Sequence, residues 1–194
     1  MNLEIYKPGT EYWFNAKIPR GTALWTLLSD GYKMAADILV KHVEDTHSNQ
    51  DYLVHPINFL LRHSIELYLK QIIYFGTELL SHSERQPKGH NVLNLWKEAR
   101  IILEERWPDG DRNVLEKHEK VLSEINAMDP SSQTFRYHID SKLKSYLLPD
   151  GCTLISIKNM AIIISETGEF LENCAYGLQC ELDEVMSNYE YITE

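Results

Sequence analysis

The chain has little cysteine and shows no targeting or membrane-spanning pattern. Its three cysteines, at positions 152, 174 and 180, are odd in number and match no zinc spacing, so we interpret them as free thiols. The start, MNLEIYKPGTEYWF, lacks the basic stretch and apolar run of a signal peptide. The apolar runs are too short and interrupted to span a bilayer. We therefore expect a cytoplasmic protein without a membrane segment.

Motifs for several common chemistries are also missing. The sequence contains no His-Glu-x-x-His, no Cys-x-x-Cys, no Gly-rich phosphate loop and no Gly-x-Ser-x-Gly. We expect neither a metal site nor a cofactor.

Positive charge is scarce at one end of the chain. The net charge is −10, and residues 159–194 hold eight acids but no Lys or Arg. The rest of the chain is nearly neutral, which leaves room for a small basic patch but not for a long nucleic-acid groove. The acidic end fits either a solvated helix face or a docking surface for a basic partner.

Apolar residues recur at helical spacing along most of the chain. They predict helices at about 22–46, 52–76, 91–106, 112–127 and 157–190. Pro-Asp-Gly turn chemistry near residues 145–155 indicates a structured loop or small hairpin before the last helix. The predicted fold is all-α, an up-and-down bundle of about five helices covering residues 22–194. Residues 1–21 form an N-terminal arm whose aromatics, Tyr12, Trp13 and Phe14, we expect to pack on the body.

Polar residues interrupt the apolar pattern of the second helix. Arg62 and Glu66 are four residues apart and share one face. They fit either a buried ion pair that joins helices or an Arg held ready for an anion by Glu66. His90, at the start of the third helix, fits a cap, an interhelical contact or a catalytic imidazole.

An aromatic stretch precedes the last helix. In an extended conformation, Arg136 and His138 lie on one side and Phe135 and Tyr137 on the other. An Arg and a His on one side can contact a phosphate and transfer a proton. The alternative is a loop held by its aromatics, with the Arg bonded to helix-end carbonyls.

The order of three motifs resembles the HEPN superfamily of helical domains. The motifs are Glu66 to Lys70 (E-L-x-L-K), Gly89 to Val92 (G-H-N-V) and Arg136-Tyr137 before the last helix. Two positions depart from the usual pattern: His138 stands where Pro is common and Val92 where Leu is common. The resemblance implies a homodimer with a cleft near the dimer seam, and a partner that is RNA or another protein.

Catalytic HEPN proteins are metal-independent endoribonucleases with an Arg followed four to six residues later by a His. Arg112-Asn113 and His118 fit this spacing, as do Arg85 and His90. However, six residues at about 100° each place Arg112 and His118 roughly 120° apart around a helix. His118 also lies on the apolar stripe.

The sequence therefore favours a non-catalytic binding module that contacts RNA or a protein partner in a stress or defence setting. Its binding candidates are Arg62, Glu66 and His90. The alternatives are an endoribonuclease, with Arg112, Asn113, His118, Arg136 and His138 as catalytic candidates, and a structural oligomerisation domain.

Overall fold

The computed structural model describes residues 7, 9–81, 87–137 and 154–193, without the side chains of residues 23 and 189–193. These ranges contain five α-helices, a short 3₁₀ turn and no strand. The helices are α1 (Ala23–Thr46), α2 (Gln50–Leu79), α3 (Val92–Arg106), α4 (Arg112–Met128) and α5 (Ile157–Thr193). The predicted all-α up-and-down bundle is confirmed, whereas the hairpin expected near residues 145–155 falls almost entirely outside the described residues.

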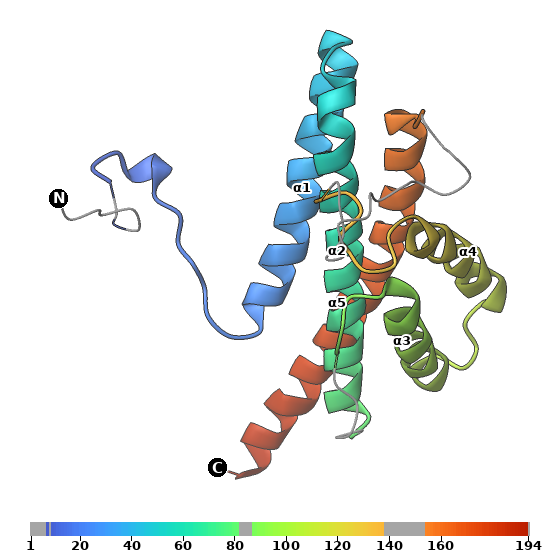
Figure 1. The fold of residues 1–194 in the computed structure, drawn as a ribbon. Coiled ribbons are helices and arrows are strands. Elements are labelled where there is room, and N and C mark those ends of the chain that lie inside the picture. The colour runs from blue at the N-terminus through green and yellow to red at the C-terminus, as the bar shows by residue number, and fades with distance from the viewer. Residues whose placement is uncertain (1–6, 8, 82–86, 138–153, 194) are drawn as a thin grey trace.

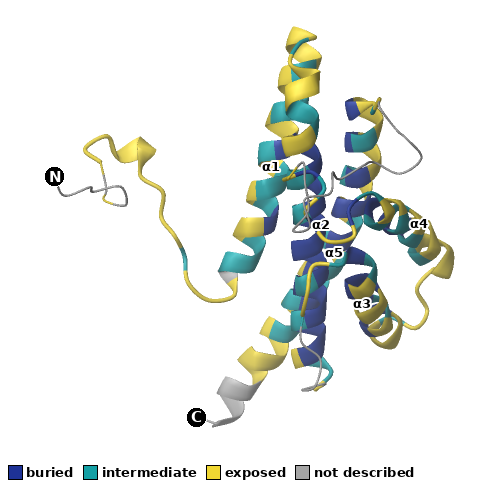
Figure 2. Ribbon diagram, in the orientation of Figure 1, coloured by how far each residue is buried: buried dark blue, intermediate teal, exposed yellow. Residues whose placement is uncertain are grey.

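Helix α2 is the centre of the bundle. It packs against α1, α3 and α5 (Figure 1), and it is buried on almost every side from Ile57 to Thr77 (Figure 2). Its Ile65, Leu69 and Ile72 are fully buried, as is Trp96 of α3. Each fully buried aliphatic side chain contributes roughly 1.5–3 kcal/mol, so α2 supplies much of the core.

Side-chain caps fix the starts of α3 and α4. The Asn91 side chain accepts a hydrogen bond from the N–H of Asn94 at 2.9 Å, and Asp111 accepts one from the N–H of Asn113 at 2.9 Å. Such caps satisfy backbone donors that a helix leaves unpaired at its first turn. Asn91, rather than His90, is thus the cap of α3.

Helices α2 and α3 approach each other closely at Gly76. A Cβ atom at this position would lie 2.2 Å from Cγ2 of Ile102. Only glycine leaves room for Ile102, which is itself fully buried. The glycine therefore sets how closely the two helices pack.

The arm differs from the sequence-based expectation. A 3₁₀ turn, Tyr12–Phe14, carries the three aromatics away from the bundle (Figure 1), and each is at least 63% exposed. The expectation that they pack on the body is wrong. Helix α1 is also poorly covered: among its described side chains, only Ser29 and Ala36 are buried. None of the described helices combines the length and apolarity needed to cross a membrane.

Candidate functional site

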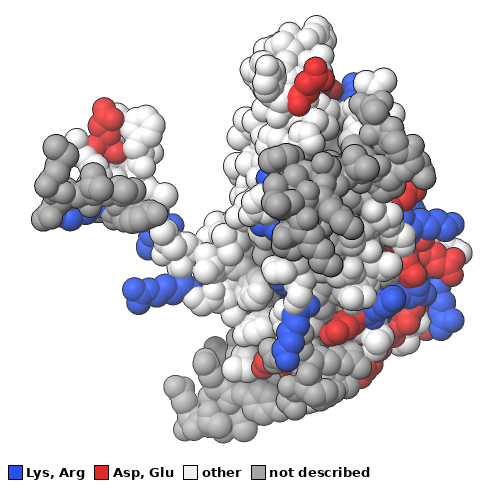
Figure 3. Space-filling model, in the orientation of Figure 1, with Lys and Arg blue, Asp and Glu red and all other residues white. Residues whose placement is uncertain are grey.

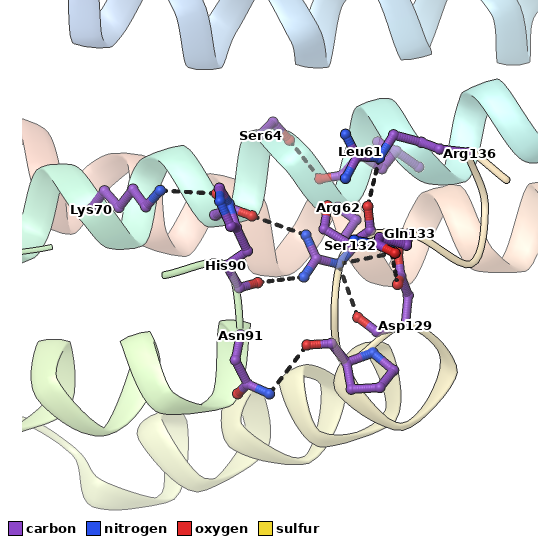
Figure 4. A network of polar contacts seen from close by, with 12 residues as sticks. Leu61, Arg62, Ser64, Lys70, His90, Asn91, Asp129, Ser132, Gln133 and Arg136 are labelled. Atoms are coloured by element: carbon purple, nitrogen blue, oxygen red, sulfur yellow. Dashed lines mark hydrogen bonds and ion pairs between the residues drawn. The ribbon is translucent and has the colours of Figure 1, made fainter. Parts of the chain in front are cut away.

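The polar centre of the molecule is Arg62, on the buried face of α2. Its side chain is fully buried, and each guanidinium nitrogen has a partner (Figure 4). Nη1 donates to Oε2 of Glu66 at 3.0 Å, Nη2 to the carbonyl of His90 at 2.5 Å, and Nε to the carbonyl of Asp129 at 3.2 Å. One arginine therefore ties α2 to the start of α3 and to the end of α4.

Glu66 is the matching acid, and only 1% of its side chain is exposed. Its Oε1 accepts hydrogen bonds from Nζ of Lys70 at 3.0 Å and from Nδ1 of His90 at 2.8 Å. Burial alone would raise the pKa of the Glu66 carboxyl, but the hydrogen bonds from His90, Lys70 and Arg62 outweigh it and hold that pKa below its ordinary value. Glu66 is therefore a carboxylate at neutral pH, and it fixes the exposed His90 ring by one nitrogen.

Asp129 holds the segment that follows α4. Its Oδ1 accepts hydrogen bonds from the N–H groups of Gln133 at 2.8 Å and Thr134 at 3.1 Å. Its Oδ2 lies 3.6 Å from Nε of Arg62. The carboxylate thus shapes the turn that leads to Arg136 and links this turn to the buried arginine.

Arg136 lies on the surface next to this network. Its Nε donates to the carbonyl of Ser132 at 2.6 Å. The carbon of its guanidinium lies 5.3 Å from the ring centroid of Phe59 and 5.6 Å from that of Tyr137. A guanidinium within about 6 Å of an aromatic face is attracted to it. Arg136 and Tyr137 are both exposed, so the Arg136 guanidinium and the Tyr137 ring lie together at the surface.

His63 extends the aromatic surface along α2. Its ring stacks on Phe59, with centroids 5.6 Å apart and an interplanar angle of 9°, and it meets Tyr32 edge-on at 4.4 Å. Burial lowers the pKa of the His63 imidazole below its ordinary value, and the negative charge of Glu66 opposes this only in part. His63 is therefore neutral near pH 7 and serves as a flat aromatic surface.

The nuclease-like pair on α4 is not assembled. Arg112 is exposed at the first turn, and the backbone N–H of Asn113 belongs to the helix cap. His118 is buried: its ring stacks on Phe170 with centroids 4.2 Å apart, and Nδ1 lies 3.1 Å from Oγ1 of Thr167. Burial also lowers the pKa of His118. One residue faces solvent and the other faces the core, so they cannot share a phosphate.

Of the remaining candidates, His138 lies outside the described residues. The part of the chain that the structure describes holds no group of His, Cys, Asp and Glu side chains that could bind a metal ion.

Three of the predicted residues come together directly: Arg62, Glu66 and His90. Arg136 joins them through the turn at Asp129 and Ser132 (Figure 4). Asp129 and Phe59 also belong to this site, although they are not among the candidates from the sequence, because their partners Arg62 and Arg136 are distant in the chain.

The surrounding surface carries mixed charge. On the face shown in Figure 3, basic and acidic side chains intermingle over α3 and α4. Examples are the ion pairs of Arg100 with Glu104 and Glu119.

The chain matches no family model, no curated protein and no solved structure.

Proposed function

We propose that this chain is a non-catalytic helical binding module resembling HEPN domains, and that it holds single-stranded RNA at the surface around Arg136. The observation that carries the proposal is the Arg136 guanidinium lying against Phe59 and Tyr137 at an exposed position. The resemblance further supports a homodimer with a role in stress or defence, and we place the protein in the cytoplasm as part of the same proposal.

The chemistry of this surface suits an unpaired nucleotide. An exposed ring such as Tyr137 can stack on a base, and the adjacent guanidinium can contact the phosphate. Stacking does not depend on base identity, so little sequence preference is expected. The body of the chain is nearly neutral, which favours a contact of a few nucleotides over a long groove.

Support for a non-catalytic role comes from the polar residues themselves. Arg62 donates its hydrogen bonds to the Glu66 carboxylate and to the backbone carbonyls of His90 and Asp129. It is therefore engaged in holding the fold and has no exposed surface to offer a phosphate. Arg112 and His118, the pair with nuclease spacing, face different environments.

The test is the affinity of the full chain for a fluorescent single-stranded RNA at several salt concentrations. Arg136→Ala should weaken binding about tenfold and lower the salt slope by about 0.7, the share of one phosphate contact. Tyr137→Ala should weaken binding about tenfold with an unchanged slope. Arg112→Ala, which removes an exposed arginine elsewhere, is the matched control and should bind like wild type. Equal affinities for all four proteins would reject the proposal.

Two other functions are distinguished by the same materials. Incubation with mixed RNA in EDTA tests a metal-independent endoribonuclease: cleavage that disappears in His118→Ala or His138→Ala would replace the binding proposal. A structural oligomerisation domain is the second alternative. An oligomerisation domain predicts that neither wild type nor any variant binds RNA. If Tyr137 instead contacts a protein partner, that partner should compete with RNA, and Tyr137→Ala should weaken its binding as well.

A further inference from the structure

The N-terminal arm presents a preformed aromatic hook, residues 9–15. The hook is closed by two hydrogen bonds: the N–H of Gly9 donates to Oδ1 of Asn15 at 2.7 Å, and Nδ2 of Asn15 donates to the Gly9 carbonyl at 2.9 Å. The Tyr12 and Trp13 rings meet edge-on at 5.1 Å, and Trp13 lies 6.3 Å from Phe14. The ring contacts are thus within the hook, which has its own structure although it stands away from the bundle (Figure 1).

The hook exposes an unusual amount of apolar surface. Tyr12 is 79% exposed, Trp13 63% and Phe14 78%, and Ile18 of the following linker is 82% exposed. Consecutive exposed aromatics of this kind typically mark an interaction site, and Trp and Tyr are enriched among the residues that dominate binding energy at protein interfaces.

Helix α1 carries an apolar stripe that the described residues leave exposed. Leu27, Met34 and Ile38 are 56%, 63% and 62% exposed. Their spacings of seven and four residues place them within about 40° of one another around the helix. Gly31 lies between them, and a Cβ atom there would meet nothing within 4 Å. The stripe, Leu27 to Ile38, is about 16 Å long.

We infer that the hook of one copy seats on the α1 stripe of a second copy, and that the exchange is reciprocal. Each aromatic buries roughly 150–250 Å² when covered, so the exposed parts of three rings amount to roughly 300–500 Å². With an equal area on the stripe and two such contacts, the total is roughly 1,200–2,000 Å², the size of a stable interface.

The linker favours a second copy over the hook's own helix. Pro19 restricts Ile18 to an extended backbone, and residues 15–20 run outward without helical structure. Lys17 and Arg20 are exposed on this linker and are opposite in sign to the acids of α5. The charges would steer an incoming arm towards the acidic side of the partner.

The experiment measures the mass of the full chain by sedimentation between about 1 and 100 μM, a range that brackets micromolar affinity. Wild type should be a dimer. The hook variant Trp13→Ala/Phe14→Ala and the stripe variant Met34→Glu/Ile38→Glu should each raise the dissociation constant about a hundredfold or more. Tyr52→Ala, at an aromatic that is 82% exposed, is the matched control and should dimerise like wild type.

Mixing the two variants tests reciprocal exchange. The stripe variant keeps its hook and the hook variant keeps its stripe, so the mixture should regain a mixed dimer with one of the two contacts. A monomeric wild type at the highest concentration overturns the inference, whether the hook is free or folded onto its own helix. So does a hook variant that dimerises like wild type, or a mixture that stays monomeric. RNA binding at Arg136 is read separately, and its loss would leave the dimer intact.

Discussion

Replacement of Arg62 by methionine tests the role of the buried network. Methionine has a similar length and no charge, so Arg62→Met removes the bonds to Glu66 and to the carbonyls of His90 and Asp129 with little change in volume. Lys70 and His90 still bond Glu66 after the change. The Asp129 carboxylate, whose Oδ2 lies 3.6 Å from Nε of Arg62, loses its positive neighbour.

The magnitude follows from leaving buried polar groups unpaired. Removal of one partner of a buried ion pair costs about 3–5 kcal/mol of folding free energy. For a chain of this length, 1 kcal/mol corresponds to a change of about 2–4 °C in Tm. We therefore expect Arg62→Met to lower Tm by about 6–20 °C. Combination with Asp129→Asn should recover part of the loss, because asparagine keeps an acceptor for the turn but carries no charge to leave unpaired.

The assay is urea unfolding followed by tryptophan fluorescence, with circular dichroism for Tm. Arg112→Met, at an exposed arginine, is the matched control and should stay within about 0.5 kcal/mol of wild type. A loss below about 1 kcal/mol in Arg62→Met would refute the structural role of the network. The bonds around Arg62 would then add little to the free energy of unfolding.

Two further predictions concern the core. Gly76→Ala should cost about 1–3 kcal/mol of folding free energy, because the new methyl group would overlap Ile102. Gly168→Ala, whose Cβ would lie 3.7 Å from Cδ1 of Ile65, should stabilise the chain by about 0.5–1 kcal/mol. Urea midpoints of both variants check this, and equal effects would contradict the packing. Because burial lowers the pKa of His118 from 6.5, the unfolded state binds more protons just below that pH, so stability should fall on acidification below about pH 6.5. His118→Gln should lose less of its urea midpoint between about pH 8 and pH 5.5 than wild type; identical losses would show that His118 does not titrate with folding.

The network also supports the surface that is proposed to bind RNA. Arg62 joins three segments that are distant in the sequence, and Asp129 bonds the two N–H groups that shape the turn before Arg136. The surface proposed to contact RNA is thus held in place by the buried hydrogen bonds of Arg62 and Asp129. A change in Asp129 is expected to act on both stability and binding, unlike a change in Arg136.

Helix positions could be predicted because their signals are local. Apolar spacing indicated the second helix at 52–76, and the structure has it at Gln50–Leu79; the last was expected at 157–190 and spans Ile157–Thr193. The cap of α4 is a local feature of the same kind, because Asp111 directly precedes the helix and its side chain accepts a hydrogen bond from the N–H of Asn113.

The sequence alone determined the all-helical class and the helix order, because apolar periodicity depends on residues a few positions apart. Tertiary structure decided what the polar residues do. From the sequence, Arg62 and Glu66 fit an ion pair or an anion site, and only the carbonyls of His90 and Asp129, which lie 28 and 67 residues from Arg62 in the chain, complete the network. The exposed hook and the bare face of α1 were likewise hidden, because burial depends on which distant surfaces meet.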